Sequence, residues 1–266
     1  MDNKKAMVVI SFGSTFDETR THDIGGIEQA LAAAFPAYDH FRAFTSVIIR
    51  KRLAERGIKI YDTETVLKQL QEKGYEEVIL QPTHLLHGEE FEQKVLSLQE
   101  KYAHAFKKIR ISHPLIDSDD DFSLAASAIA AQVPTLADDE GVVFMGHGTP
   151  RNNNKAHGYT YVKLQEIFDK MNFPAIVGTV EEEDTPNLEA VLAKLKERGY
   201  KHVHMYPLMV VAGDHANNDM YSDEDDSWKT QIEALGIKTT GHLCGLGRVK
   251  SIQALYVQHV LRSLSI

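Results

Sequence analysis

Short runs rich in β-branched residues alternate with amphipathic segments along this sequence, and the alternation limits the choice of fold more than any other feature. The apolar run at residues 7–10 is typical of a strand, the segment at 24–35 is typical of a helix, and the alternation continues to residue 133. Consecutive strands that are joined by helices form parallel sheets with helices on both faces. We therefore expect an α/β fold.

The pattern restarts after residues 134–141, which contain a proline and several acidic residues but no apolar periodicity. We predict that this segment links an N-terminal α/β lobe at residues 1–133 to a C-terminal α/β lobe at residues 142–266. Gly74 and Gly199 each end a helix before a strand, and a proline follows both at the same interval. Such self-similarity predicts two similar Rossmann-like lobes with parallel sheets and an active site in the cleft between them.

Composition and charge narrow the classes of partner. The 266-residue chain has a formal net charge of −9, which argues against a dedicated nucleic-acid-binding protein. Its one cysteine, Cys244, cannot form an internal disulfide and argues against a metal site built from cysteines. No apolar run approaches the length that spans a membrane, and the N-terminus lacks the features of a signal peptide. We therefore expect a cytoplasmic protein that binds neither nucleic acid nor membranes.

Side chains of the kinds that bind metals follow three strands predicted in the C-terminal lobe. His147 lies between two glycines directly after one strand, Glu181 follows the next, and His215 lies in a polar run at residues 213–219. Because the carboxyl ends of parallel strands meet at one edge of a sheet, we expect these three side chains to converge. Two imidazoles and one carboxylate leave coordination positions open. The set suits Co²⁺, Fe²⁺, Ni²⁺ or Zn²⁺ without choosing among them.

Structural roles are the alternative for each of these residues. A histidine at a strand end can bond to the backbone, and Glu181 begins an acidic run that is typical of a solvated surface. The flanking glycines favour a functional His147, and the density of metal-binding groups around it favours a functional His215. Among the other histidines, His202 and His204 alternate along a predicted strand and are expected on one of its faces.

Other chemistries lack their motifs. The sequence contains neither a Gly-x-x-x-x-Gly-Lys-[Ser/Thr] phosphate loop nor the Gly-x-Ser-x-Gly of nucleophile-elbow hydrolases. A histidine phosphotransferase would have arginine immediately before its reactive His-Gly, where this chain has Gly146. The metal-binding interpretation of His147 is therefore preferred.

Several segments resemble the sirohydrochlorin cobaltochelatases of the anaerobic pathway, which belong to the class II chelatases. The run Ala-Gly-Asp-His-Ala-Asn-Asn-Asp-Met at residues 212–220 is the most specific of them. The other segments lie at residues 11–13, 42–46, 144–148, 177–181, 207–211 and 226–229. The resemblance therefore spans essentially the whole chain.

The resemblance implies a lyase that inserts Co²⁺ into sirohydrochlorin, or into a precorrin-2-type tetrapyrrole, during cobalamin biosynthesis. It implies a chelatase-like fold with the active site in the cleft between the lobes. It also implies that His147, Glu181 and His215 are the metal ligands and that His147 is a proton acceptor. Insertion replaces two pyrrole protons with the metal, and a histidine nitrogen that holds the metal cannot take a proton at the same moment. Either the steps are sequential or another group takes the second proton. Glu90 is the candidate, since the repeat aligns it with His215.

The repeat is asymmetric at the metal position. Phe12 of the first lobe aligns with His147 of the second, so we expect the metal on the second lobe. The carboxylates of the tetrapyrrole require cations. The candidates are Arg20, Arg42, Arg50, Arg52 and Arg151.

Two alternative functions stay open. One is a ferrochelatase-type enzyme that inserts Fe²⁺ for sirohaem or haem synthesis, and the other is a metal- or tetrapyrrole-binding protein without turnover. We expect no cofactor beyond the divalent metal substrate, for which the resemblance implies Co²⁺, with Fe²⁺, Ni²⁺ or Zn²⁺ possible in vitro. The partners are then the tetrapyrrole and the metal, and a homo-oligomer is left open.

Overall fold

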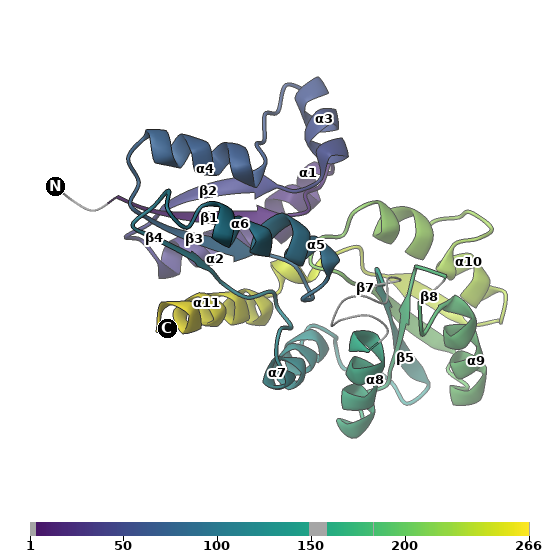
Figure 1. Cartoon of the computed structure of the whole chain (residues 1–266). Coiled ribbons are helices and arrows are strands. Elements are labelled where there is room, and N and C mark those ends of the chain that lie inside the picture. Colours follow the sequence, from purple (N-terminus) through teal and green to yellow (C-terminus); the bar gives the residue numbers. More distant parts are fainter. Residues whose placement is uncertain (1–3, 149–158, 183, 266) are drawn as a thin grey trace. The chain divides into compact units, whose positions relative to one another are not determined.

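The computed structural model describes residues 4–148, 159–182 and 184–265, and Figure 1 traces the chain. The chain divides into two compact units. Unit 1 comprises Met1–Asp117 and Lys250–Ile266, and unit 2 comprises Ser118–Val249. Each unit contains a four-stranded parallel sheet, so the predicted α/β fold with parallel sheets is confirmed.

The sheet of unit 1 has the strand order β2-β1-β3-β4, and each neighbouring pair is parallel. Its strands are β1 (Lys5–Ser11), β2 (Asp39–Phe44), β3 (Glu77–Pro82) and β4 (Lys108–Ile111). The helical elements are α1 (Asp17–Thr19), η1 (Arg20–Ile24), α2 (Gly25–Ala34), α3 (Val47–Glu55), α4 (Thr63–Glu72), α5 (Glu89–Phe91), η2 (Glu92–Leu96), α6 (Ser97–Lys101) and α11 (Lys250–Leu264).

The core of unit 1 lies on both faces of this sheet. Val8 and Ile10 of β1 belong to one apolar cluster with Leu67 of α4 and Val95 of η2. Figure 1 shows α2 and α11 on the other side of the sheet, where they pack together. The central strand β1 is buried almost throughout, as expected for a parallel strand that is covered on both faces.

The sheet of unit 2 repeats this topology in the order β6-β5-β7-β8. Its strands are β5 (Glu140–Gly146), β6 (Ala175–Thr179), β7 (His202–Leu208) and β8 (Lys238–Gly241). The helical elements are α7 (Asp119–Ala130), α8 (Thr160–Lys170), α9 (Leu188–Arg198), η3 (Ala216–Met220), α10 (Trp228–Glu233) and η4 (Leu246–Arg248). The shared strand order agrees with the predicted repeat.

Alternate residues of β5 face two helical layers. Val143 joins a cluster with Val191 of α9 and Trp228 of α10. On the opposite face Phe144 stacks on Phe168 of α8, with ring centroids 5.4 Å apart and an interplanar angle of 20°. The buried strand is thus held rigidly up to its carboxyl end, where the predicted metal ligand His147 follows.

The predicted domain boundaries are wrong in two places. The segment 134–141 was predicted as the linker, but it lies inside unit 2, and β5 already begins at Glu140. Helix α7 belongs to unit 2, where it packs against α8, whereas the terminal helix α11 belongs to unit 1 and packs against α2. The apolar face of a helix indicates that it is covered but not which sheet lies beneath it. The predicted cleft between the lobes stays a prediction.

Among the described residues, no helix combines the length and hydrophobicity needed to cross a membrane.

Candidate functional site

Three predicted metal ligands lie together at the carboxyl edge of the sheet of unit 2. His147 directly follows β5, Glu181 follows β6 in the next loop, and His215 lies in the loop between β7 and η3. The Nε2 atom of His147 is 3.8 Å from Oε1 of Glu181. The rings of His147 and His215 have centroids 4.9 Å apart and meet edge to face at 84°. The structure therefore places His147 beside both of the other predicted ligands, which come from separate loops.

Two glycines allow the backbone at His147 to approach its neighbours closely. A Cβ atom on Gly146 would lie 2.2 Å from Cε1 of Tyr161, and one on Gly148 would lie 3.0 Å from Cβ of Glu181. Gly148 also has a φ of +102°, which side chains disfavour. Its N–H donates to the hydroxyl of Tyr161 at 3.2 Å. Burial raises the pKa of Tyr161 to about 12, so this phenol stays neutral while it supports the loop.

Backbone hydrogen bonds tie the loop after β6 to the loop after β5. The N–H of Val180 donates to the carbonyl of Gly146 at 2.9 Å, and the N–H of Glu181 donates to the carbonyl of His147 at 3.3 Å. These bonds continue the parallel pairing beyond the strands. They hold the backbone of Glu181 beside that of His147.

The histidine rings are oriented through their Nδ1 atoms. His215 Nδ1 lies 2.7 Å from Oδ2 of Asp219, which is one helical turn further on in η3. His147 Nδ1 lies 3.2 Å from the carbonyl oxygen of Gly148. Such partners fix the tautomer and direct Nε2 toward a ligand, as in many metal sites. His147 Nε2 is also the ring nitrogen that lies 3.8 Å from the Glu181 carboxylate.

The three side chains are only half-buried. The exposed fractions are 52% for His147, 39% for Glu181 and 41% for His215. Neutral imidazoles and a carboxylate that remain accessible to solvent can bind a divalent ion and still leave positions for an incoming ligand. This is the arrangement expected of a site that receives and releases a metal.

The chain matches a known family along its length. The sequence profile described as "Cobalt chelatase (CbiK)" matches residues 5–265. The chain belongs to this family. It is 39% identical over 263 residues to the sirohydrochlorin cobaltochelatase of Salmonella typhimurium, covering 98% of this chain and 97% of that protein. It is 29% identical over 267 residues to the sirohydrochlorin cobaltochelatase CbiKC of Nitratidesulfovibrio vulgaris, covering 98% and 91%.

Solved structures share the chelatase fold. SirB from Bacillus subtilis with Fe³⁺ has a TM-score of 0.61 at 14% identity, over 98% of this chain and 95% of that one. SirB from Bacillus subtilis subspecies spizizenii in complex with cobalt has a TM-score of 0.63 at 12% identity, over 98% and 96%. At these identities the likeness concerns the fold alone. The family and the fold class expected from the sequence are both confirmed.

Glu90, the predicted second proton acceptor, lies in α5 of unit 1. Its carboxylate accepts a hydrogen bond from the hydroxyl of Thr45, and its Oε2 atom is 3.9 Å from Nε2 of His84. The side chain is 36% exposed, so it remains accessible to solvent. Its catalytic role stays a prediction.

Most of the arginines predicted to bind substrate already form ion pairs within unit 1. The pairs are Arg20 with Asp17 at 2.6 Å, Arg42 with Glu28 at 2.5 Å and Arg50 with Asp62 at 3.2 Å. Arg52 is exposed, and Arg151 lies outside the described residues. A substrate carboxylate would have to compete with a protein carboxylate for each of the three paired arginines.

Sequence reasoning missed the role of Tyr161. Its contact with Gly146 and Gly148 depends on how α8 packs on the end of β5, for which the sequence carries no local signal. The pairing of Asp219 with His215 could have been found, because side chains four residues apart lie on the same side of a helical turn.

Proposed function

We propose that this member of the cobalt chelatase family inserts Co²⁺ into sirohydrochlorin and that His147, Glu181 and His215 hold the ion before transfer. The convergence of these three side chains from three loops of unit 2 is the observation that carries the proposal. The choice of substrate is supported by the relatives, since the one that is 39% identical across nearly its whole length is a sirohydrochlorin cobaltochelatase.

The donor set suits a metal that is a substrate rather than a resident cofactor. Three half-exposed nitrogen and oxygen ligands leave coordination positions for the ring nitrogens of the tetrapyrrole. A closed site of four cysteines would retain the ion, whereas these ligands can be exchanged one at a time as the ring nitrogens take over. We propose that no other cofactor takes part.

Insertion releases two protons from the pyrrole nitrogens for each divalent ion that enters. His147 Nε2 cannot bind the metal and a proton at the same time, so proton uptake follows the departure of the ion from this nitrogen. An imidazole is suited to accept a proton near neutral pH. Glu90 is the proposed second acceptor, since its carboxylate is solvent-accessible and follows the loop that the repeat aligns with that of His215.

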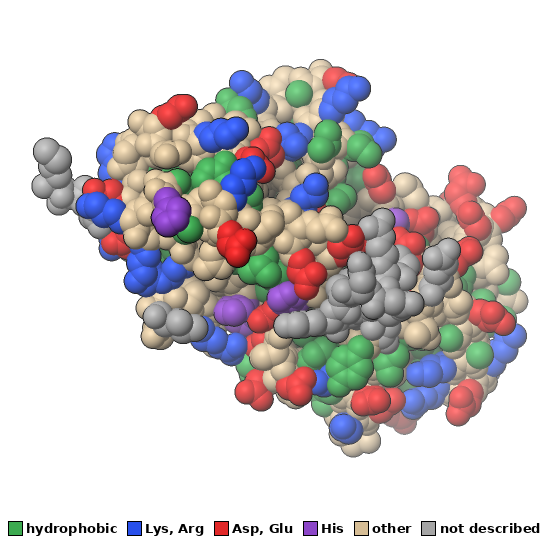
Figure 2. Space-filling model, in the orientation of Figure 1, with side chains coloured by type: hydrophobic (Ala, Val, Ile, Leu, Met, Phe, Trp, Pro, Cys, Tyr) green, Lys and Arg blue, Asp and Glu red, His purple; other side chains and the backbone are tan. Residues whose placement is uncertain are grey.

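The charge of the chain is divided unevenly between its two units, which favours a different substrate at each. Unit 2 has 21 Asp and Glu against 11 Lys and Arg, whereas unit 1 has 17 against 18, so the acidic excess of the chain lies in unit 2. Figure 2 shows acidic side chains (red) gathered toward the α10 end of unit 2, where residues 223–226 are exposed. This field attracts a divalent cation and repels a polycarboxylate. We therefore assign the tetrapyrrole carboxylates to unit 1.

Unit 1 also offers apolar surface for the macrocycle. Phe12 is 52% exposed after β1, and Val47 and Ile48 are 66% and 65% exposed at the start of α3. The Ser46 N–H donates to the Phe12 carbonyl at 3.2 Å, so these residues lie in neighbouring loops at the carboxyl edge of the unit 1 sheet. Large apolar side chains that are left exposed beside one another are typical of a binding surface.

The metal-ligand assignment is tested by His147→Ala and His215→Ala, with His104→Ala as a matched control because His104 is an exposed histidine of unit 1. The initial rate of Co²⁺ insertion into sirohydrochlorin is followed by absorbance without oxygen. We expect each site variant to fold normally and to lose about 100-fold or more in rate, while the control keeps the parent rate.

Rates within a few-fold of the parent for both site variants would refute the assignment. The same assay with Fe²⁺ in competition at defined free concentrations separates a cobaltochelatase from a ferrochelatase. A single turnover without further product would indicate a carrier protein instead.

A further inference from the structure

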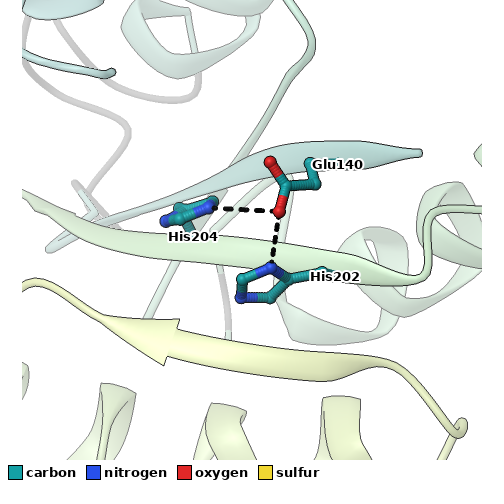
Figure 3. A group of neighbouring side chains, drawn as sticks. All are labelled: Glu140, His202 and His204. Carbon is teal, nitrogen blue, oxygen red and sulfur yellow. Dashed lines mark hydrogen bonds and ion pairs between the residues drawn. The ribbon is translucent and has the colours of Figure 1, made fainter. Parts of the chain in front are cut away.

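A second group of metal-binding side chains lies in unit 2, away from the site described above. Figure 3 shows Glu140 on one strand and His202 and His204 on the next. Glu140 is the first residue of β5 and pairs in register with His202, the first residue of β7. His204 follows two residues later and therefore lies on the same face of the sheet. The sheet itself brings the three side chains together.

The ligand atoms of this group are spaced as a small metal ion requires. His202 Nδ1 is 2.8 Å from Oε1 of Glu140, and His204 Nε2 is 4.0 Å from the same oxygen. One ligand atom from each residue lies within 4.8 Å of the other two. Tetrahedral ligands that lie about 2.1 Å from an ion are about 3.4 Å from one another. Small rotations of the side chains would therefore bring the three ligand atoms to these separations.

The outer nitrogens of both imidazoles already have partners. His202 Nε2 lies 2.8 Å from the hydroxyl of Thr240, and His204 Nδ1 lies 3.0 Å from Nε2 of His242. The His242 ring stacks on Tyr206, with centroids 4.2 Å apart and planes at 1°. Metal-binding histidines usually hold their second nitrogen in this way, which fixes the ring and its tautomer.

The side chains of this group are largely buried. Those of Glu140, His202 and His204 are between 14% and 25% exposed. The attraction between a cation and a carboxylate is stronger in such a partly desolvated setting than in bulk water.

We propose that Glu140, His202 and His204 form a second metal site that binds a divalent transition ion such as Co²⁺, Ni²⁺ or Zn²⁺ independently of His147. Glu140 begins β5 and His147 follows its last residue, so the two sites lie about 20 Å apart at about 3.3 Å per residue. An ion bound at Nδ1 of His202 would leave the ring proton on Nε2, from where it can be donated to the Thr240 hydroxyl. The ion joins β5 to β7 and stabilises the folded unit.

The test starts from the full chain with His147→Ala and His215→Ala, without a histidine tag and after treatment with a chelator. This variant lacks two of the proposed ligands of the first site, so any ion that remains belongs elsewhere. Zn²⁺ and Co²⁺ binding are measured by equilibrium dialysis with metal analysis, and the ligands by X-ray absorption spectroscopy. We expect one ion per chain, coordinated by two imidazoles, and a rise in unfolding temperature when the ion is added.

Further substitutions in this background identify the ligands. His202→Ala or His204→Ala should abolish binding of the retained ion, and Glu140→Gln should weaken it while keeping the size of the side chain. His242→Phe, which keeps an aromatic ring against Tyr206, should lower the affinity by about 10- to 100-fold because it removes an outer partner.

The proposal is overturned if the background variant binds no ion, or if His204→Ala binds as tightly as its parent. If circular dichroism shows that an alanine variant does not fold, the proposal is judged on two other measurements. These are metal binding by the Glu140→Gln variant and the X-ray absorption spectrum of the background variant. A spectrum without two imidazoles also overturns the proposal. In the otherwise unchanged protein, His202→Ala should leave the rate of Co²⁺ insertion unaltered. The proposal for the second site and the proposed function are therefore tested separately.

Discussion

Replacing Gly146 with alanine tests how the backbone beside His147 is held. The new Cβ atom would lie 2.2 Å from Cε1 of Tyr161 and 2.9 Å from Cδ1 and Cζ of the same ring. Carbon atoms in contact lie about 3.5–4.0 Å apart, so the ring has to move by more than about 1 Å. Tyr161 is buried and its hydroxyl accepts the Gly148 N–H, so this movement also displaces the loop that carries His147.

The expected effect falls on both stability and activity. Overpacking of this kind lowers the free energy of unfolding by about 1–3 kcal/mol. A displacement of about 1 Å at a reacting group lowers the rate by about 100-fold. Urea unfolding measures the first quantity for Gly146→Ala, and the initial rate of Co²⁺ insertion into sirohydrochlorin measures the second.

Gly213→Ala is the matched control, because a Cβ atom on Gly213 meets no heavy atom within 4 Å among the described residues. Its free energy of unfolding should stay within about 0.5 kcal/mol of the parent. Combining Gly146→Ala with Tyr161→Leu removes the ring, so the double variant should lose less stability than the two single variants together. A Gly146→Ala protein with the parent's urea midpoint and insertion rate would show that the Tyr161 contact does not hold the loop.

Two further substitutions address ionisable groups. Asp219→Asn weakens the hydrogen bond that orients the His215 ring. The Co²⁺ affinity measured by calorimetry should therefore fall by about 10- to 100-fold, while the urea midpoint stays unchanged. An unchanged affinity would show that Asp219 does not orient His215 for metal binding. Hydrogen bonds from His113 and then His87 lower the pKa of Asp117 to about 2, so this carboxyl stabilises the fold above its unfolded pKa of about 3.9 and loses that contribution as pH falls toward 2. Urea titrations should therefore find Asp117→Asn less stable than the parent at pH 6, with a gap that narrows below about pH 4; a constant gap would refute the reasoning.

Local patterns predicted much of the architecture. The alternation of strand and helix runs predicted parallel sheets, and both observed sheets have the same strand order, in agreement with the predicted repeat. A continuous apolar run indicates a strand that is buried on both faces. The central strands β1 and β5 are both buried in this way. The assignment of α7 and α11 to units could not be predicted in this way, because an apolar face does not specify its partner.

Both the sequence and the tertiary structure were needed to define the candidate metal site. His147, Glu181 and His215 could be selected from the sequence because their residue types can bind metals and because parallel strands end at one edge. The 3.8 Å and 4.9 Å separations arise from the pairing of β5 with β6 and β7 and from the close approach that Gly146 and Gly148 allow. These depend on packing between segments that are far apart along the chain.

The sequence by itself determined the α/β class, the repeated lobes and the residue types at the strand ends, since these follow from local periodicity and composition. Only the tertiary structure decided that Tyr161 supports the His147 loop and that Glu140 lies beside His202 and His204. Register between strands and packing of helices onto sheets are fixed by the free energy of the whole fold. A short stretch of sequence carries too little of that free energy to specify them.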